Sequence, residues 1–400
     1  MSMRVLSVFG TRPEAIKMAP VIRALEGRPE FDSRVCVTGQ HRQMLDQVLE
    51  IFSIKPHYDL SLMQAGQDLN GLTGRILAGV KGVLRQDRPD LVIIQGDTTT
   101  CMATALAAFY ERVPIAHVEA GLRSGRLDAP FPEEANRCIV SRITDLHFAP
   151  TVQARDNLIK EAIQPQQIAV TGNTVIDALL LTRDRVHKHP TRHWAKQLGS
   201  TLCDALEGHE DKVILITGHR RENFGQGMED LCAAIRDLAV THGNWLFIYP
   251  VHLNPRVQEP VHNILRGFSN IHLIEPLDYL SFVWLMNRSD LILTDSGGIQ
   301  EEAPSLGKPV LVMRDVTERT EAVEAGTVRL VGTNRAVIRY EVERLLTKPE
   351  LYQAMASIAN PYGRGNSATE IVESIERWAA GEPLSEAPPS RGWPAASNVA

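Results

Sequence analysis

The stretch that decides the fold is Val5-Leu6-Ser7-Val8-Phe9-Gly10-Thr11-Arg12-Pro13-Glu14. Its first half is an apolar run typical of a buried strand, and Gly10 ends that run. Pro13 stands where a helix begins, because its fixed φ suits the first helical turn. An amphipathic pattern then continues to Glu26. The stretch therefore predicts a strand, a turn and a helix, the repeating unit of a parallel sheet.

The same rhythm recurs along the chain, and apolar strands that alternate with helices are typical of parallel sheets covered on both faces. We therefore expect an α/β fold with two Rossmann-like parallel-sheet domains. The expected strands, after Val5–Phe9, are Arg34–Thr38, Leu91–Gln95, Pro114–Val118, Leu146–Ala149, Ile168–Val170, Val213–Thr217, Trp245–Tyr249, Ile271–Ile274, Leu291–Thr294 and Val310–Val312. The helical patterns are Glu14–Glu26, Gln43–Phe52, Thr99–Glu111 and Pro132–Ile143.

The length of 400 residues is too great for one core, at about 150 residues per domain. The periodicity weakens over Thr191–Glu210, so we expect a junction near Asn173–His189. The predicted domains are 1–177 and 178–360, followed by a helix within 361–380 and a disordered tail over 381–400. If the two domains face one another, the cleft between them is where a ligand would bind.

Composition excludes several classes of protein. With 44% hydrophobic residues, 22% charged residues and a net charge of −6, the chain is typical of a soluble globular protein. It has no basic field that would attract nucleic acid. Its apolar runs are all shorter than about 18 residues, so no membrane span is expected. Five cysteines without a C-x-x-C pair indicate reduced thiols, and we expect a cytoplasmic location.

Polar residues follow the expected strands, where ligands of parallel sheets bind. Ser296-Gly297-Gly298 is the best candidate for a phosphate cradle, although an ordinary capped helix gives the same pattern. Arg12 and Lys17 form a second candidate anion clamp or a solvated basic face. Glu302 would accept hydrogen bonds from ribose hydroxyls. Alternatively, it is a surface acid whose negative charge is favourable near a helix N-terminus.

Other site classes are disfavoured. No G-x-x-x-x-G-K-[ST] motif occurs, and Gly225-Gln226-Gly227 lacks the third glycine of a dinucleotide fingerprint. His117 and Glu119 have no third ligand at a metal spacing. We therefore expect neither a cofactor nor a metal.

Four further residues are candidates for acid–base chemistry. Asp97, Glu119, Glu133 and His219 lie at strand ends or at a helix start, in both halves of the chain. Each alone has a structural explanation. Together, facing one cleft, they indicate proton transfer.

Six segments closely resemble the bacterial non-hydrolysing UDP-N-acetylglucosamine 2-epimerases, and the likeness spans residues 3–376. They are Phe9–Lys17, Gln95–Thr100, His117–Arg123, Pro132–Arg137, Thr217–Glu222 and Thr294–Glu302. The resemblance implies the two-domain fold of the GT-B glycosyltransferases and a homodimer, with a last helix that packs back on the first domain. It also implies interconversion of UDP-GlcNAc and UDP-ManNAc for envelope polysaccharide synthesis, without a nicotinamide or an obligatory metal.

The chemistry implied by the resemblance is elimination and re-addition of UDP. The C2 proton is not next to a carbonyl in the ring, so its simple removal would leave an unstabilised carbanion. Loss of UDP from C1 as the C2 proton leaves gives a 2-acetamidoglucal instead, and protonation of the opposite face gives the epimer.

The resemblance assigns roles to particular residues. Asp97, Glu119 and Glu133 are the proton-handling carboxylates, and His219 stabilises the diphosphate or transfers protons. The implied substrate contacts, besides Asp97, Glu119 and His219, come from Arg12, Lys17, Phe282, Ser296, Gly297, Gly298, Glu302 and Arg319. An activator region would include Gln40, Gln43, Glu133, Arg220 and His252.

Two positions depart from relatives. Leu277 replaces a glutamine that contacts uracil in some family members, and Gly66 replaces an arginine of Gram-positive members. Three alternatives to a non-hydrolysing epimerase also stay open: a GT-B glycosyltransferase that uses the same nucleotide sugar, a hydrolysing epimerase and a catalytically silent nucleotide-sugar sensor.

Overall fold

The computed structural model of the 400-residue chain describes residues 2–39, 42–62, 64 and 66–384. The chain forms two compact units. The N-terminal unit contains Met1–Asp177 and Gly365–Ala400, and the C-terminal unit contains Ala178–Arg364. Of the sequence predictions, Gln40 and the tail from residue 385 onward lie outside the described residues.

The N-terminal unit is built on a seven-stranded sheet in the order β3-β2-β1-β4-β5-β6-β7. All its strand pairs are parallel. The strands are β1 (Met3–Phe9), β2 (Phe31–Val37), β3 (Tyr58–Asp59), β4 (Leu91–Gln95), β5 (Ile115–Val118), β6 (Leu146–Ala149) and β7 (Ile168–Val170). The chain order reverses beside β1 and β4, so the loops after these strands diverge at the carboxyl edge of the sheet.

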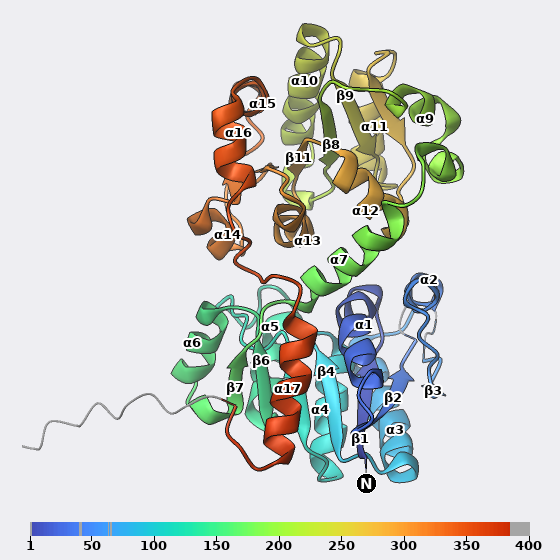
Figure 1. Ribbon diagram of the computed structural model, residues 1–400, viewed down its shortest axis with the longest axis vertical. Coiled ribbons are helices and arrows are strands. Elements are labelled where there is room, and N and C mark those ends of the chain that lie inside the picture. The colour runs from blue at the N-terminus through green and yellow to red at the C-terminus, as the bar shows by residue number, and fades with distance from the viewer. Residues whose placement is uncertain (1, 40–41, 63, 65, 385–400) are drawn as a thin grey trace, which may run out of the picture. The chain divides into compact units, whose positions relative to one another are not determined.

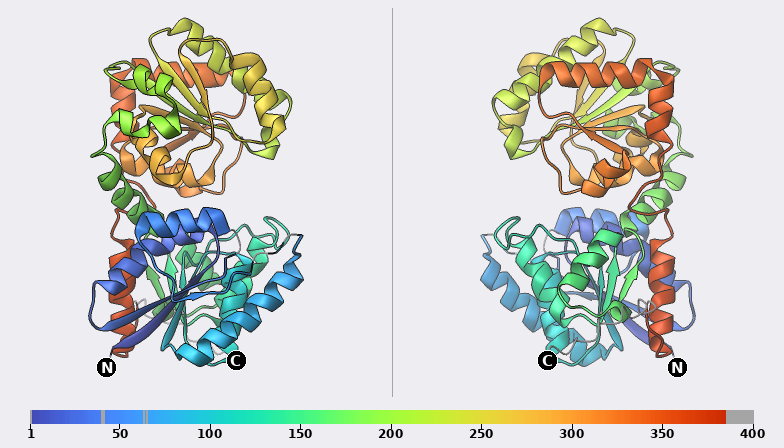
Figure 2. Two further views of the ribbon diagram at one scale, coloured as in Figure 1. Left: turned by 90° about the vertical axis from the view of Figure 1, so that its right-hand side faces the viewer. Right: turned by 90° about the vertical axis from the view of Figure 1, so that its left-hand side faces the viewer.

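Helices cover both faces of this sheet (Figures 1 and 2). On one face α3 (Leu69–Asp87) packs on α4 (Thr99–Tyr110), which also packs on α5 (Glu133–Ile143). On the other face α1 (Arg12–Glu26) contacts α2 (Arg42–Phe52) and α17 (Ser367–Ala379). The unit also contains α6 (Val152–Lys160), and α7 (Thr174–Val186) begins in it and continues into the C-terminal unit.

The C-terminal unit repeats this plan with a six-stranded parallel sheet in the order β10-β9-β8-β11-β12-β13. Its strands are β8 (Val213–Thr217), β9 (Leu246–Pro250), β10 (Ile271–Ile274), β11 (Leu291–Thr294), β12 (Val310–Val312) and β13 (Val328–Leu330). Its helices are α8 (Ala195–Leu198), α9 (Ser200–Leu206), α10 (Gln226–Thr241), α11 (Pro255–Leu265), α12 (Tyr279–Arg288), α13 (Gly297–Glu302), α14 (Thr320–Ala325), α15 (Arg335–Thr347) and α16 (Pro349–Ala356). The main core lies between the sheet and α10, α11 and α15.

The two segments of the N-terminal unit are joined at the start of α17. The Asp177 carboxylate accepts hydrogen bonds from the Ser367 N–H at 3.3 Å and the Ala368 N–H at 2.9 Å. Burial raises the pKa of Asp177, and these hydrogen bonds oppose that rise. Asp177 therefore caps a helix that lies 190 residues away in the chain.

The α/β prediction with two parallel-sheet domains is confirmed, and several strands have the predicted bounds, including β4 and β11. Two features differ from the sequence analysis. Thr191–Glu210 is not irregular throughout, because it contains α8 and α9. The junction near Asn173–His189 is largely helical, since α7 runs through it. None of the helices in the described part of the chain is both long enough and apolar enough to cross a membrane.

Candidate active site

Glu119 is the centre of a buried polar cluster at the carboxyl edge of the N-terminal sheet. Lys17 Nζ lies 2.6 and 2.7 Å from its two carboxylate oxygens. Asn173 Nδ2 donates to Oε1 at 3.0 Å, and Gln95 Nε2 donates to Oε2. Three elements far apart in sequence, α1, β4 and the loop before α7, thus hold one carboxylate in place. Its charge is balanced by the ammonium, which an ion this buried requires.

The backbone at Glu119 is unusual, because its φ is +65° in a residue that is not glycine. Such strain persists only where the surroundings enforce it, and it is common at functional sites. Gly121, two residues later, also has a positive φ, of +89°. A Cβ there would lie 2.2 Å from the Ala154 carbonyl oxygen in α6, so the chain passes too close to that helix for a side chain.

Asp97 follows the neighbouring strand β4 and is paired with a different cation. Arg137 of α5 donates to Asp97 Oδ2 from Nε at 2.9 Å and from Nη2 at 2.6 Å. The same guanidinium donates to Glu134 at 2.8 Å. Asn136 Nδ2 donates to the Asp97 carbonyl at 2.8 Å. Helix α5 therefore fixes both the backbone and the side chain of Asp97.

His117 stands behind these carboxylates as a neutral group. Burial lowers its pKa to about 4, and its Nε2 lies 2.7 Å from the Gly96 carbonyl oxygen. A carbonyl only accepts, so Nε2 carries the proton and joins the ends of β4 and β5. This hydrogen bond gives His117 a structural role at the edge of the sheet.

Glu14 is a buried carboxylate that joins the loop after β1 to the loop after β4. It accepts hydrogen bonds from the Gly10 N–H at 3.0 Å, the Thr11 N–H at 2.8 Å and Thr98 Oγ1 at 2.6 Å. Burial raises the pKa of Glu14, and these hydrogen bonds oppose the rise. The bonds with Thr11 complete the capping box of α1.

Two residues of this unit that were predicted as site residues, Glu133 and Arg12, lie outside the polar cluster around Glu119. Glu133 is half-buried at the first position of α5 and, within the described residues, its carboxylate forms no hydrogen bond or ion pair. Arg12 is also half-buried, at the start of α1. Lys17, predicted with Arg12 as a candidate anion clamp, donates to Glu119.

In the C-terminal unit, Ser296-Gly297-Gly298 begins α13 as predicted. The Ser296 side chain makes no capping hydrogen bond, so the structure does not show the ordinary capped helix that was the alternative. A Cβ at Gly297 would lie 3.1 Å from Arg319 Cζ. The guanidinium of Arg319 therefore packs directly against the glycine backbone, and it is held there by Glu301 at 2.8 Å.

The other predicted binding residues of this unit lie on nearby elements. Glu302 ends α13, and Tyr279 OH donates to its Oε2 at 3.4 Å. Phe282 lies in α12 and is half-buried, and Leu277 lies just before that helix. Leu277 has an apolar side chain and offers a base only its backbone groups for hydrogen bonding.

His219 follows β8 and faces the buried Asp295, which follows β11. Its Nδ1 lies 3.5 Å from Asp295 Oδ1, and its ring stacks on His252 with centroids 5.3 Å apart. Burial lowers the pKa of His219, Asp295 raises it, and His252 and Arg220 lower it further. Of the predicted activator set, the structure thus places Arg220 and His252 beside His219. The side chain of Gln43 lies outside the described part of the structure, as Gln40 does.

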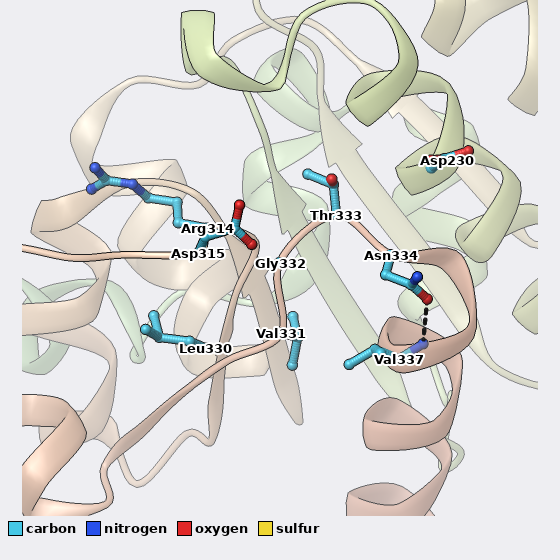
Figure 3. A pocket seen from close by; sticks show the side chains of 9 residues that line it. All are labelled: Asp230, Arg314, Asp315, Leu330, Val331, Gly332, Thr333, Asn334 and Val337. Atoms are coloured by element: carbon cyan, nitrogen blue, oxygen red, sulfur yellow. Dashed lines mark hydrogen bonds between the residues drawn. The ribbon is translucent and has the colours of Figure 1, made fainter.

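A polar hollow of about 510 Å³ opens beside β13 and the start of α15. Figure 3 shows Arg314 on one side of it and, on the other, Asn334, whose Oδ1 accepts a hydrogen bond from the Val337 N–H at 3.2 Å. The Arg314 guanidinium is already paired with Glu222 at 2.6 Å and with Glu318 at 3.0 Å. Because Arg314 is held in these two ion pairs, it is not available to bind an anion in the hollow.

Several residues that form hydrogen bonds or ion pairs at the carboxyl edges of the two sheets had no role in the sequence predictions. Gln95, Arg137, Asp295 and Glu301 stood inside the quoted motifs, and Asn173 stood only in the expected junction. The capping pattern Thr-x-x-Glu could have identified Glu14. Among the described residues no group of His, Cys, Asp and Glu side chains is arranged to hold a metal ion.

The chain matches known proteins over most of its length. The family model described as UDP-N-acetylglucosamine 2-epimerase matches residues 23–376. The chain belongs to this family. It is 56% identical over 374 residues to the UDP-N-acetylglucosamine 2-epimerase of Escherichia coli K12, which covers 94% of this chain and 98% of that protein. The enzyme of that name from Salmonella typhimurium LT2 is 56% identical over 378 residues, with 94% of this chain and 99% of that protein covered.

A solved structure in the UDP-N-acetylglucosamine 2-epimerase family agrees with this fold. The crystal structure of the Neisseria meningitidis enzyme bound to UDP-GlcNAc is 50% identical, with a TM-score of 0.83 over 94% of this chain and 100% of that chain. The family resemblance and the two-domain, GT-B-like α/β fold predicted from the sequence are therefore confirmed.

Proposed function

We propose that this protein catalyses the reversible epimerisation of UDP-N-acetylglucosamine at C2, giving UDP-N-acetylmannosamine for envelope polysaccharide synthesis. The observation that carries the proposal is the pair of carboxylates on neighbouring strand ends, each fixed by its own cation: Glu119 by Lys17 and Asp97 by Arg137. Membership of the 2-epimerase family supports the same reaction.

The N-terminal unit supplies the groups that move the C2 proton. Epimerisation needs proton transfer on both faces of the sugar ring, and one carboxylate cannot serve both. Asp97, Glu119 and Glu133 are the proposed proton-handling groups. The Lys17 contact stabilises the carboxylate form of Glu119, which is the form that accepts a proton.

The C-terminal unit binds the nucleotide in this proposal. Ser296, Gly297 and Gly298 present backbone N–H groups, and Arg319 and His219 add side-chain donors for the leaving diphosphate. Glu302 accepts from ribose hydroxyls, and Phe282 packs on uracil. Arg12 and Lys17 of the N-terminal unit complete the set of substrate contacts.

The reaction balances without an added cofactor. As the C2–H bond breaks, its electrons form the C1–C2 double bond of the glucal, and the C1–O bond breaks to release UDP. Return of UDP to C1 and a proton to the other face of C2 completes the cycle. Incubation with UDP-GlcNAc in D₂O, followed by proton NMR, should therefore show deuterium at C2 together with growth of the manno epimer.

The result separates the competing functions. Absence of deuterium at C2 would refute the epimerase, and binding without exchange would favour a nucleotide-sugar sensor. Release of free N-acetylmannosamine would favour a hydrolysing enzyme, and sugar transfer to an added acceptor would favour a glycosyltransferase. Asp97→Asn and His219→Ala should abolish exchange, whereas Glu26→Gln and His187→Ala, which change exposed residues, should not.

The proposal includes a homodimer, a cytoplasmic location and an activator region around Arg220 and His252. Exposed Phe109 and Tyr110 at the end of α4 provide apolar surface that a second copy would bury. Sedimentation equilibrium tests the dimer. A sigmoidal dependence of the rate on UDP-GlcNAc, lost in His252→Ala, tests the activator region.

A further inference from the structure

Asp295 is a buried carboxylate that the proposed reaction does not yet use. It directly follows β11 and its exposed fraction is 0%. Its two oxygens have different surroundings. Oδ2 accepts hydrogen bonds from the N–H groups of His219 and Arg220, both at 2.8 Å, and from Asn223 Nδ2 at 3.2 Å.

The other oxygen, Oδ1, is buried without a hydrogen bond. Its nearest polar neighbour among the described ion pairs is His219 Nδ1, at 3.5 Å. A buried carboxylate oxygen that lacks a donor is costly, so a donor placed this close is strongly favoured. Only a protonated Nδ1 satisfies it, because an unprotonated nitrogen would place two lone pairs against each other.

We propose that Asp295 is the positioning residue for His219: Oδ2 fixes its loop, and Oδ1 selects the tautomer with the proton on Nδ1. Nε2 of the neutral ring then has the free lone pair and is the nitrogen that exchanges protons. The consequence for catalysis rests on the epimerase function proposed above. When Nε2 gains a proton, Asp295 stabilises the imidazolium, which is the form that stabilises a departing diphosphate.

The groups that surround the ring fit this role. His252, from the loop after β9, stacks on the ring and fixes its plane. Arg220 is the adjacent cation and Asp295 the adjacent anion. Because Asp295 is the one anion among these neighbours, its removal should lower the pKa of His219.

Asp295→Asn is the informative substitution, because the amide oxygen can still accept from the two loop N–H groups. Its NH₂ group would face His219 Nδ1 as a donor and so reverse the tautomer. The ¹⁵N chemical shifts of His219, assigned with His219→Gln, should change from protonated Nδ1 to protonated Nε2. We expect kcat to fall by at least about 100-fold, with KM within about threefold and the acid limb of the kcat–pH profile displaced to lower pH.

Asp290→Asn is the matched control. Asp290 precedes the same strand, and its carboxylate also accepts a backbone N–H, that of Val213 in β8, at 2.8 Å. This variant should keep the wild-type tautomer and kcat. A kcat for Asp295→Asn within twofold of that of Asp290→Asn, or an unchanged His219 tautomer, would overturn the proposal.

The wild-type protein provides a test that does not depend on folding of a variant. A wild-type His219 that carries its proton on Nε2 would overturn the inference even if Asp295→Asn does not fold. The two proposals also fail separately. Without C2 exchange in the wild type, the epimerase function is wrong while the tautomer measurement still tests Asp295.

Discussion

The two units have the same plan, a parallel sheet between layers of helices, yet their carboxyl edges are built differently. In the N-terminal unit, the two carboxylates proposed for proton transfer face side-chain cations: Glu119 faces Lys17 and Asp97 faces Arg137. In the C-terminal unit, the buried Asp295 instead receives backbone N–H groups, those of His219 and Arg220. The fold supplies the positions of these loops, and the side chains determine the chemistry.

In the proposed reaction, this difference corresponds to two tasks. A group that takes and returns a proton must be a side chain with a second charge state, so the N-terminal edge contains paired carboxylates. A group that stabilises an anion works best when it is rigid and already oriented, and backbone N–H groups meet that need. The four predictions below test this division, from the largest expected effect to the smallest.

Glu119→Gln should have the largest effect. It removes the proposed proton acceptor and leaves Lys17 without its carboxylate, so the rate of C2 deuterium exchange should fall about 1,000-fold. Proton NMR in D₂O measures this rate. Glu301→Gln, which changes a carboxylate of the other edge, should instead raise the KM for UDP-GlcNAc with little change in kcat. Equal losses of kcat in the two variants would contradict the division.

Acid should destabilise the N-terminal unit more than the C-terminal unit. Burial lowers the pKa of His117 to about 4 and that of His147 to about 3, from 6.5. Between pH 6.5 and these values the unfolded chain binds more protons, so stability is present at neutral pH and is lost as the pH falls. Each of these buried histidines should lower the free energy of unfolding by about 2 kcal/mol when the pH falls from 7 to 5.

Hydrogen exchange of the β5 and β6 amides at pH 7 and pH 5 measures this loss. His147→Gln should reduce the pH dependence, because glutamine does not titrate, and the exposed His187→Gln should not. His219 and His272 of the C-terminal unit are only partly buried, so its amides should respond less. The same pH dependence in both units would be evidence against this explanation.

Gly297→Ala tests the backbone cradle at the C-terminal edge. The added methyl group would lie 3.1 Å from Arg319 Cζ and push the guanidinium away. We expect KM for UDP-GlcNAc to rise about tenfold, which corresponds to about 1.4 kcal/mol. Steady-state kinetics should show no change for Gly243→Ala, where a Cβ has no heavy atom within 4 Å. Unaltered KM in Gly297→Ala would argue against the cradle.

The smallest effect is expected from Arg28→Ala in the N-terminal unit. Arg28 is paired with Glu376, and at 3.4 Å with Glu373, both in α17. A partly exposed pair of this kind contributes about 0.5–1 kcal/mol, so Tm should fall by a few degrees at most without loss of activity. Arg126→Ala, which removes an exposed pair with Asp128, should leave Tm unchanged. Calorimetry distinguishes the two variants.

Local pattern was sufficient to predict most strands but not every element. β4 and β11 are continuous apolar runs between turns, and both bounds are as predicted. Helix α3 was missed because Gly71, Gly74, Gly79 and Gly82 dilute its apolar face. β3 was missed because it has two residues. Neither has enough of its own periodicity to be recognised without the sheet that supports it.

The candidate site shows the same limit. Asp97 and Glu119 could be predicted because they lie one or two residues after the ends of β4 and β5, at the carboxyl edge of the sheet. Their partners could not, since Lys17 lies 102 residues from Glu119 in the chain and Arg137 lies 40 residues from Asp97. Tertiary folding alone brings such pairs together.

The cap that Asp177 provides for α17 has a topological consequence. The N-terminal unit is interrupted after Asp177 and resumes at Gly365, so the whole C-terminal unit is an insertion in it. Asp177 and Ser367 are hydrogen-bonded, and the two ends of the interrupted unit are therefore adjacent. A short Gly/Ser bridge between them would close the N-terminal unit on itself. Residues 178–364 are thus inserted between two chain positions that are adjacent in the N-terminal unit.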